Sequence, residues 1–240
     1  MNLYAYCLSD EVTPGVIDLA QGVAGAQARL IECGSLKAVV SDFDGERAQV
    51  TRESIFAHES IIHRVLARTT PLPFRFGMVT TEARLESYVG AHERALLVQL
   101  SRVRGAVEMS VKIIWDAEAV KRAAIGQADG EAVTSAPEMT GPGAAFLAAK
   151  RREIAGDEAL RKEAKELARW LEERLSETVR ESSVRLYPTS GMAIAAAHLV
   201  ERERLDKYRS VIAQARKERG GLRFLTSGEW PPYSFCELSS

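Results

Sequence analysis

The 240-residue sequence lacks the features of several common protein classes. Its aromatic content is only 7%, and its 32 basic and 33 acidic side chains leave a formal net charge of -1. A nearly neutral chain has no overall field that would steer it toward nucleic acid or an anionic membrane. No apolar run approaches the roughly 18 to 20 residues that a membrane-spanning helix needs, and the N-terminus has no signal-peptide pattern. We therefore expect a cytoplasmic protein with neither nucleic acid nor a lipid membrane as partner.

Cysteine and catalytic motifs are also scarce. Cys7, Cys33 and Cys236 form neither a CxxC pair nor a zinc spacing, so we interpret them as buried reduced thiols. The sequence has no P-loop, no dinucleotide-binding glycine fingerprint and no G-x-S-x-G elbow. We predict no catalytic residue, no cofactor and no metal, and hence a protein that is not an enzyme.

One segment comes close to a metal motif. HESIIH, from His58 to His63, resembles the HExxH helix of zinc proteases but is one residue too long. At about 100° per residue, five residues place the two imidazoles about 140° apart on a helix. Because a regular helix cannot bring them to one ion, we expect surface or core-edge histidines.

The first half of the chain predicts an α+β domain over residues 1–104. Strands are expected over residues 3–8, 28–32 and 36–41, and amphipathic helices over 51–68 and 82–103. Between the helices, the segment PLPFRFGMV is predicted to be extended, with Arg75 opposite its apolar side chains. Arg75 fits either an anion-binding role or an internal ion pair, and we favour the internal pair. Gly105 marks the predicted boundary.

The second half predicts a domain over residues 105–240. The expected order is a strand over 107–115, a short helix from 117 to 124, a flexible loop over 126–143, and a helix over 144–181 that Gly156 bends or interrupts. Strands over 184–187 and 193–200, joined by a turn, a helix over 203–219 and a strand over 222–226 follow. This βαββαβ order is typical of a ferredoxin-like domain. RNA-recognition modules share it, but the expected central strands carry too few aromatic residues to stack bases.

The C-terminal tail, residues 227–240, contains the most unusual segment, SGEWPPYSF. Pro231 and Pro232 exclude a helix, and we predict a stiff turn or strand ending whose three aromatic side chains pack between the last strand and the rest of the protein. The aromatic residues are Trp230, Tyr233 and Phe235. On this interpretation Trp230→Ala costs about 3 to 5 kcal/mol of stability. A recognition role for the aromatics is the alternative.

Several of these segments resemble the gas vesicle GvpL/GvpF family. The resemblance rests on PLPFRFG, which contains Pro73, Arg75, Phe76 and Gly77, on GPGAAFL around Gly143, and on GEWPPYSF at the C-terminus. The N-terminal LYAYCL and LKAVVSDF segments match as well, so the resemblance spans the chain. The family tail more often has proline where Glu229 stands here. From its residues alone, GPG is interpreted as a helix-start device rather than an anion site.

The resemblance implies a two-domain, non-enzymatic accessory or minor structural protein that contacts the small hydrophobic gas vesicle shell protein and other gas vesicle accessory proteins. Such a shell protein needs shielding from water until it assembles. We hypothesise that the long helix and loop 126–143 present the binding surface. The alternative function is a ligand-sensing regulatory module built on the ferredoxin-like domain.

Overall fold

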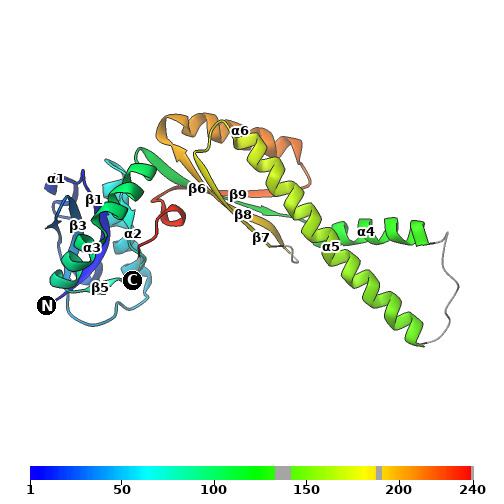
Figure 1. The fold of residues 1–240 in the computed structure, drawn as a ribbon, viewed down its shortest axis with the longest axis horizontal. Helices are drawn as coiled ribbons and strands as arrows, with labels where there is room; N and C mark the ends of the chain where they lie inside the picture. Colours follow the sequence, from blue (N-terminus) through cyan, green and yellow to red (C-terminus); the bar gives the residue numbers. More distant parts are fainter. Residues whose placement is uncertain (133–141, 188–190, 239–240) are drawn as a thin grey trace. The chain divides into compact units, whose positions relative to one another are not determined.

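The computed structural model describes residues 1–132, 142–187 and 191–238, which form a mixed α+β fold (Figure 1). The chain divides into two compact units. Unit 1 comprises residues 1–109, 199–202 and 228–240, and unit 2 comprises residues 110–198 and 203–227. The division falls inside three strands, β6 (Ala106–Ile114), β8 (Met192–Glu201) and β9 (Arg223–Trp230). The C-terminal residues thus group with unit 1, whereas the sequence placed them in a domain that starts at Gly105.

Unit 1 contains an antiparallel sheet with the strand order β2-β3-β1-β4, and β5 also pairs with β1. Its strands are β1 (Asn2–Ser9), β2 (Ala28–Cys33), β3 (Leu36–Phe43), β4 (Leu72–Pro73) and β5 (Val79–Thr80). The three long strands lie where the sequence predicted them. Strand β1 has neighbours on both edges of the sheet, and its side chains are buried along almost its whole length.

The helical elements of unit 1 are α1 (Pro14–Ile17), η1 (Val23–Gly25), α2 (Arg52–Leu66) and α3 (Glu82–Val103). Thr51 begins α2 as predicted, since its hydroxyl accepts a hydrogen bond from the Ser54 amide at 3.1 Å. The buried face of α2 differs from the predicted one. Ile55 is 42% exposed, and His58 takes its place among the buried residues.

The RFG segment, residues 73–78, is not one continuous extended piece. The Phe74 amide donates to the Tyr6 carbonyl at 2.8 Å, and the Ala5 amide donates to the Met78 carbonyl at 2.9 Å. The intervening residues leave the edge of the sheet and form a bulge between β4 and β5. This bulge is exposed at Arg75, whereas Phe74 is buried.

Unit 2 contains a second sheet, with the strand order β7-β8-β6-β9. Its further elements are α4 (Ala117–Ala132), α5 (Pro142–Leu175), β7 (Glu181–Leu186), η2 (Arg202–Arg204) and α6 (Leu205–Glu218). Figure 1 shows that α5 crosses the sheet and continues beyond it, where α4 lies beside its N-terminal half. Helix α4, α5 and the strands therefore follow in the predicted order, with different bounds.

The predicted flexible loop over residues 126–143 is wrong at both ends. Helix α4 continues to Ala132 and α5 already begins at Pro142, while residues 133–141 lie outside the described part of the chain. Alanine and other good helix formers in AAIGQADGEA compensate for two glycines. The predicted turn at residues 188–190 also lies outside the described residues.

Helix α5 is shorter at its end and more continuous than predicted. It ends at Leu175, whose carbonyl accepts hydrogen bonds from the Thr178 amide at 2.8 Å and the Val179 amide at 3.0 Å. Gly156 does not interrupt it. A Cβ atom at Gly156 would lie 3.2 Å from Lys121 Cγ, so the glycine allows α4 to approach closely. No helix among the described residues is both long enough and apolar enough to cross a bilayer.

Candidate partner-binding site at the C-terminal tail

The C-terminal tail begins inside a strand rather than after it. Strand β9 runs to Trp230, and the prolines that follow lead into η3 (Tyr233–Phe235). Gly228 allows this entry because its φ is +140° and a Cβ atom there would lie 3.0 Å from the Glu108 carbonyl oxygen. Any larger residue would meet strand β6 at this point. The next residue, Glu229, forms an ion pair with Arg202 at 3.7 Å.

Side chains of unit 1 hold the tail through its main chain. Glu108 accepts two hydrogen bonds from Ser234, one from the amide at 2.7 Å and one from the hydroxyl at 2.9 Å. Burial raises the pKa of Glu108, and the two bonds from Ser234 partly oppose that rise. The Gln99 side chain donates to the Glu237 carbonyl at 3.3 Å and accepts from the Glu237 amide at 2.8 Å. Helix α3 and strand β6 thus fix two points of the tail.

A buried network of hydrogen bonds fixes a third point of the tail. The Gly77 amide donates to Tyr4 Oη at 2.8 Å, and this oxygen lies 3.0 Å from His58 Nδ1. The other nitrogen of His58 lies 3.3 Å from Tyr233 Oη, which donates to Glu59 Oε1 at 3.3 Å. If the His58 imidazole is neutral and protonated at Nε2, the hydroxyls of Tyr4 and Tyr233 can each donate one hydrogen bond. This hydrogen-bonded network joins the RFG segment to the tail.

The ionisation of this polar chain follows from its burial. His58 is only 1% exposed, and desolvation lowers the pKa of its imidazole to about 4. Burial likewise raises the pKa of the Tyr4 phenol to about 12 and raises that of Tyr233. The network is therefore uncharged between Tyr4 and Tyr233 at neutral pH.

The three aromatic residues of the tail occupy different environments. Phe235 is buried, Tyr233 is half-buried, and Trp230 is 37% exposed. The Trp230 ring packs edge-on against His63 of α2, with the ring centres 5.7 Å apart. The expectation that Trp230 packs inside the protein with the other two is not what the structure shows.

A pocket of about 490 Å³ lies between the RFG segment and the tail within unit 1. One wall consists of Pro73, Phe74, Arg75, Phe76, Gly77 and Met78, and the other of Tyr233, Cys236, Glu237 and Leu238. Two segments from opposite halves of the sequence thus meet at one site. Burial raises the pKa of the Cys236 thiol to about 12, so this cysteine is a poor nucleophile at neutral pH.

Arg75 is the cationic group of this pocket. Its side chain is exposed, and it forms no ion pair or hydrogen bond with any other described residue. The favoured interpretation from the sequence, an internal pair with an acidic residue, therefore does not describe it. An unpaired guanidinium beside apolar walls is a group that can bind a carboxylate.

The structure brings together only some of the residues that the sequence singled out. Pro73, Arg75, Phe76, Gly77 and Tyr233 line the pocket. Pro231, Pro232 and Phe235 are buried but do not line the pocket, and Gly143 lies in helix α5 of unit 2.

Sequence reasoning missed four polar residues that position the tail. These are Tyr4, His58, Gln99 and Glu108. Only His58 carried a signal, because it lies four residues before Ile62 and so on the apolar face of its helix. Among the described residues, no group of three or more His, Cys, Asp or Glu side chains could hold a metal ion.

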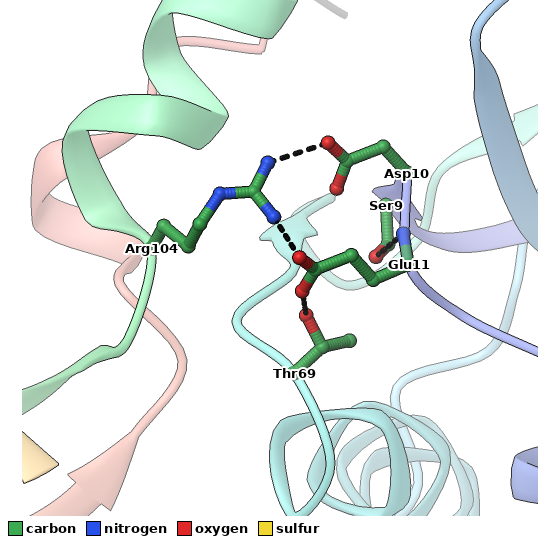
Figure 2. Close-up of polar contacts among 5 residues, drawn as sticks. All are labelled: Ser9, Asp10, Glu11, Thr69 and Arg104. Atoms are coloured by element: carbon green, nitrogen blue, oxygen red, sulfur yellow. Dashed lines mark hydrogen bonds and ion pairs between the residues drawn. The ribbon is translucent and has the colours of Figure 1, made fainter.

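A separate polar cluster fixes the end of α3, just before β6 (Figure 2). Arg104 contacts Asp10 at 2.5 Å and also contacts Glu11, whose second carboxylate oxygen accepts from the Thr69 hydroxyl at 2.6 Å. Both acidic neighbours raise the pKa of the Arg104 guanidinium. The cluster ties together the segments that follow β1, α2 and α3, and we interpret it as structural because each charged group in it is paired.

Comparison with solved structures defines the class of this fold. It resembles the crystal structure of gas vesicle protein GvpF from Anabaena sp. with a TM-score of 0.80 and 20% identity, covering 100% of this chain and 97% of the other. GvpF from Microcystis aeruginosa gives the same score and identity, covering 99% of both chains. The molecule is therefore an α+β protein with the GvpF fold.

Sequence comparison then identifies the family. Residues 2–237 match the family model described as gas vesicle synthesis protein GvpL/GvpF, and the chain belongs to this family. Gas vesicle protein F1 of Halobacterium salinarum is 28% identical, covering 99% of this chain and 93% of the relative. Gas vesicle protein F of a Streptomyces species is 26% identical, covering 99% of this chain and 100% of the relative. The resemblance that the motifs indicated is confirmed.

Proposed function

We propose that this protein is a non-enzymatic accessory protein of gas vesicle assembly that binds the small hydrophobic shell protein and chaperones or nucleates its assembly. The observation that carries this proposal is an exposed apolar stripe on helix α5, in a chain of the gas vesicle synthesis family. The stripe consists of Phe146, Leu147 and Ile154, which are 69%, 50% and 50% exposed. Its place of action is the cytoplasm and the gas vesicle, together with other gas vesicle accessory proteins.

The stripe lies on a part of α5 that has no sheet beneath it. The second half of the helix buries Leu160, Ala164, Leu167, Leu171 and Leu175, whereas the described residues of the first half are exposed as far as Ile154. Helix α4 packs near Gly156, where Lys121 forms an ion pair with Asp157 at 2.9 Å.

Leu147 and Ile154 point away from α4, and Phe146 is itself 69% exposed. At about 100° per residue, Leu147 lies about 180° from Gly156 around the helix, and Ile154 lies within about 20° of Leu147. Neither α4 nor the sheet of unit 2 therefore covers them. An apolar face of this kind can shield the hydrophobic surface of a second protein from water.

We propose further that unit 2 is a ferredoxin-like domain. In its support, the chain order is a strand, the two helices α4 and α5, two strands, a helix and a strand. The sheet order β9-β6-β8-β7 places the first and third of these strands at the centre. The extension of α5 beyond the sheet is then an addition to that arrangement, and it carries the proposed binding stripe.

Co-purification with the tagged shell protein tests the proposal. We expect the variant with Phe146, Leu147 and Ile154 all changed to Gln to capture much less shell protein than the unchanged chain. It should also restore few buoyant vesicles in a host that lacks its own gene. The matched control is the double variant Phe56→Gln with Val98→Gln, which removes apolar side chains that are 61% and 63% exposed on helices of unit 1. Equal capture by both variants would exclude the stripe as the binding surface.

A further inference from the structure

The end of the tail presents an open main-chain edge to the pocket of unit 1. Cys236 has an extended backbone, with φ of -122° and ψ of 132°. Gln99 engages both the amide and the carbonyl of Glu237. In an extended segment the main-chain groups of successive residues point to opposite sides. Those of Cys236 and Leu238 therefore point away from Gln99.

These outward main-chain groups belong to two residues of the pocket lining. Cys236 and Leu238 both line the pocket, and within the described ranges neither forms a main-chain hydrogen bond. An extended segment with one paired side and one open side is the arrangement to which a further strand can add. The RFG segment forms the opposite wall of the pocket, which has a volume of about 490 Å³.

The facing wall supplies a charge and apolar contacts. Arg75 is exposed and unpaired, and Phe76 and Met78 beside it are half-buried. A carboxylate placed there gains a charge-assisted hydrogen bond, for which Arg can offer two parallel donors. Glu237 on the tail wall would repel a carboxylate, so an acidic ligand is directed toward the Arg75 side.

We propose that this pocket binds an extended peptide segment of a partner protein, in which an acidic residue is flanked by apolar side chains. The peptide pairs with the main chain of Cys236 and Leu238, its carboxylate binds Arg75, and its apolar side chains contact Phe76 and Met78. The proposal goes beyond the proposed function, because it requires neither the shell protein nor the stripe on α5. The buried chain from Gly77 through His58 to Tyr233 holds the two walls in place.

Fluorescence anisotropy with the full chain tests the proposal. The probe is a fluorescein-labelled, end-capped peptide, Val-Thr-Val-Glu-Val-Thr-Val, and the comparison peptide has Lys in place of Glu. We expect the unchanged protein to bind the Glu peptide about 10- to 100-fold more tightly than the Lys peptide, as loss of one hydrogen-bonded charge pair implies. Absence of binding by the Glu peptide, or equal affinity for both, would overturn the proposal.

A charge reversal makes the test specific for Arg75. Arg75→Glu should bind the Lys peptide more tightly than the Glu peptide, whereas Arg75→Lys should keep the original preference. Arg68→Glu is the matched control, because Arg68 is also an exposed arginine of unit 1 that forms no ion pair with another described residue and lies outside the pocket lining. If Arg68→Glu inverts the preference as strongly as Arg75→Glu, the effect is one of net charge and the site is wrong.

The backbone of the probe tests strand pairing separately. A Glu peptide that is N-methylated on alternate residues keeps every side chain but loses the amide donors on one edge. Two such peptides, one for each edge, should differ, with one of them binding at least about 10-fold more weakly than the unmethylated probe. Undiminished binding of both would show that the main chain of Cys236 and Leu238 is not used.

Discussion

The C-terminal tail and the first half of helix α5 both contain prominent apolar residues, and the structure treats them in opposite ways. The tail buries Phe235 and half-buries Tyr233, and its polar groups are bound by Glu108, Gln99 and His58. The first half of α5 leaves Phe146, Leu147 and Ile154 exposed. The tail residue Phe235 is therefore packed within this fold, whereas the three apolar residues of α5 are not.

The largest expected effect is that of shortening the buried aromatic of the tail. Phe235 is 5% exposed, so Phe235→Ala should lower the free energy of unfolding by about 3 to 5 kcal/mol, through lost burial and a cavity. Trp230→Ala should cost clearly less, because Trp230 is 37% exposed. This expectation replaces the prediction from sequence that Trp230→Ala costs about 3 to 5 kcal/mol. Urea denaturation followed by circular dichroism measures both variants.

A matched variant separates packing from hydrogen bonding in the same tail. Tyr233→Phe keeps the ring and removes only the hydroxyl that meets His58 and Glu59, so we expect a loss of about 1 to 2 kcal/mol. If Trp230→Ala proves more damaging than Phe235→Ala, the tail is anchored differently from the contacts described.

Acid should weaken the tail through His58. Its pKa is lowered by burial from 6.5 to about 4, so folding opposes its protonation. The contribution of neutral His58 to the free energy of unfolding is fully present above about pH 6.5 and is lost as the pH falls to about 4. The shift corresponds to about 3 kcal/mol at 1.36 kcal/mol per pH unit. Urea denaturation at a series of pH values between 7 and 4 measures the loss.

The ionisation of neighbouring groups also determines how the free energy of unfolding depends on pH. Tyr4, Tyr6 and Tyr233 have raised pKa values and stay protonated over this range, and Glu59 accepts from Tyr233. Glu108 has a raised pKa, so its protonation favours the folded state as the pH falls.

Substitution of each buried histidine separates their contributions. His198 of unit 2 also has a pKa lowered by burial to about 4. His58→Gln should therefore remove the contribution of His58 to the pH profile, and His198→Gln that of His198. A profile that is unchanged in His58→Gln would contradict the assignment.

The sequence predicted helices and strands well where the apolar residues repeat at one regular spacing. Helix α3 spans residues 82–103 in both the prediction and the structure, because its apolar residues repeat at helical spacing between a threonine cap and Gly105. The same approach misplaced the ends of α4 and α5. Their sequences are rich in alanine and charged residues, so no strong apolar pattern marks where they end.

The location of the tail could not be predicted from periodicity. Its partners Glu108 and Gln99 lie 126 and 138 residues away from Ser234 and Glu237. Such pairs depend on the tertiary fold and leave no local pattern. The motifs alone identified the RFG segment and the tail as important, but not that they form one pocket. Arg75 was assigned to an internal pair because the sequence cannot show which carboxylates lie near it.

The smallest expected effect on stability is that of substituting the α5 stripe. Changing Phe146, Leu147 and Ile154 to Gln should alter the free energy of unfolding by no more than about 0.5 kcal/mol per residue, because exposed side chains lose little burial and glutamine is a good helix former. The same denaturation experiment as for the tail measures it. A loss comparable to that of Phe235→Ala would mean that the stripe is packed within this protein. The contrast between a packed tail and an exposed helix stripe would then fail.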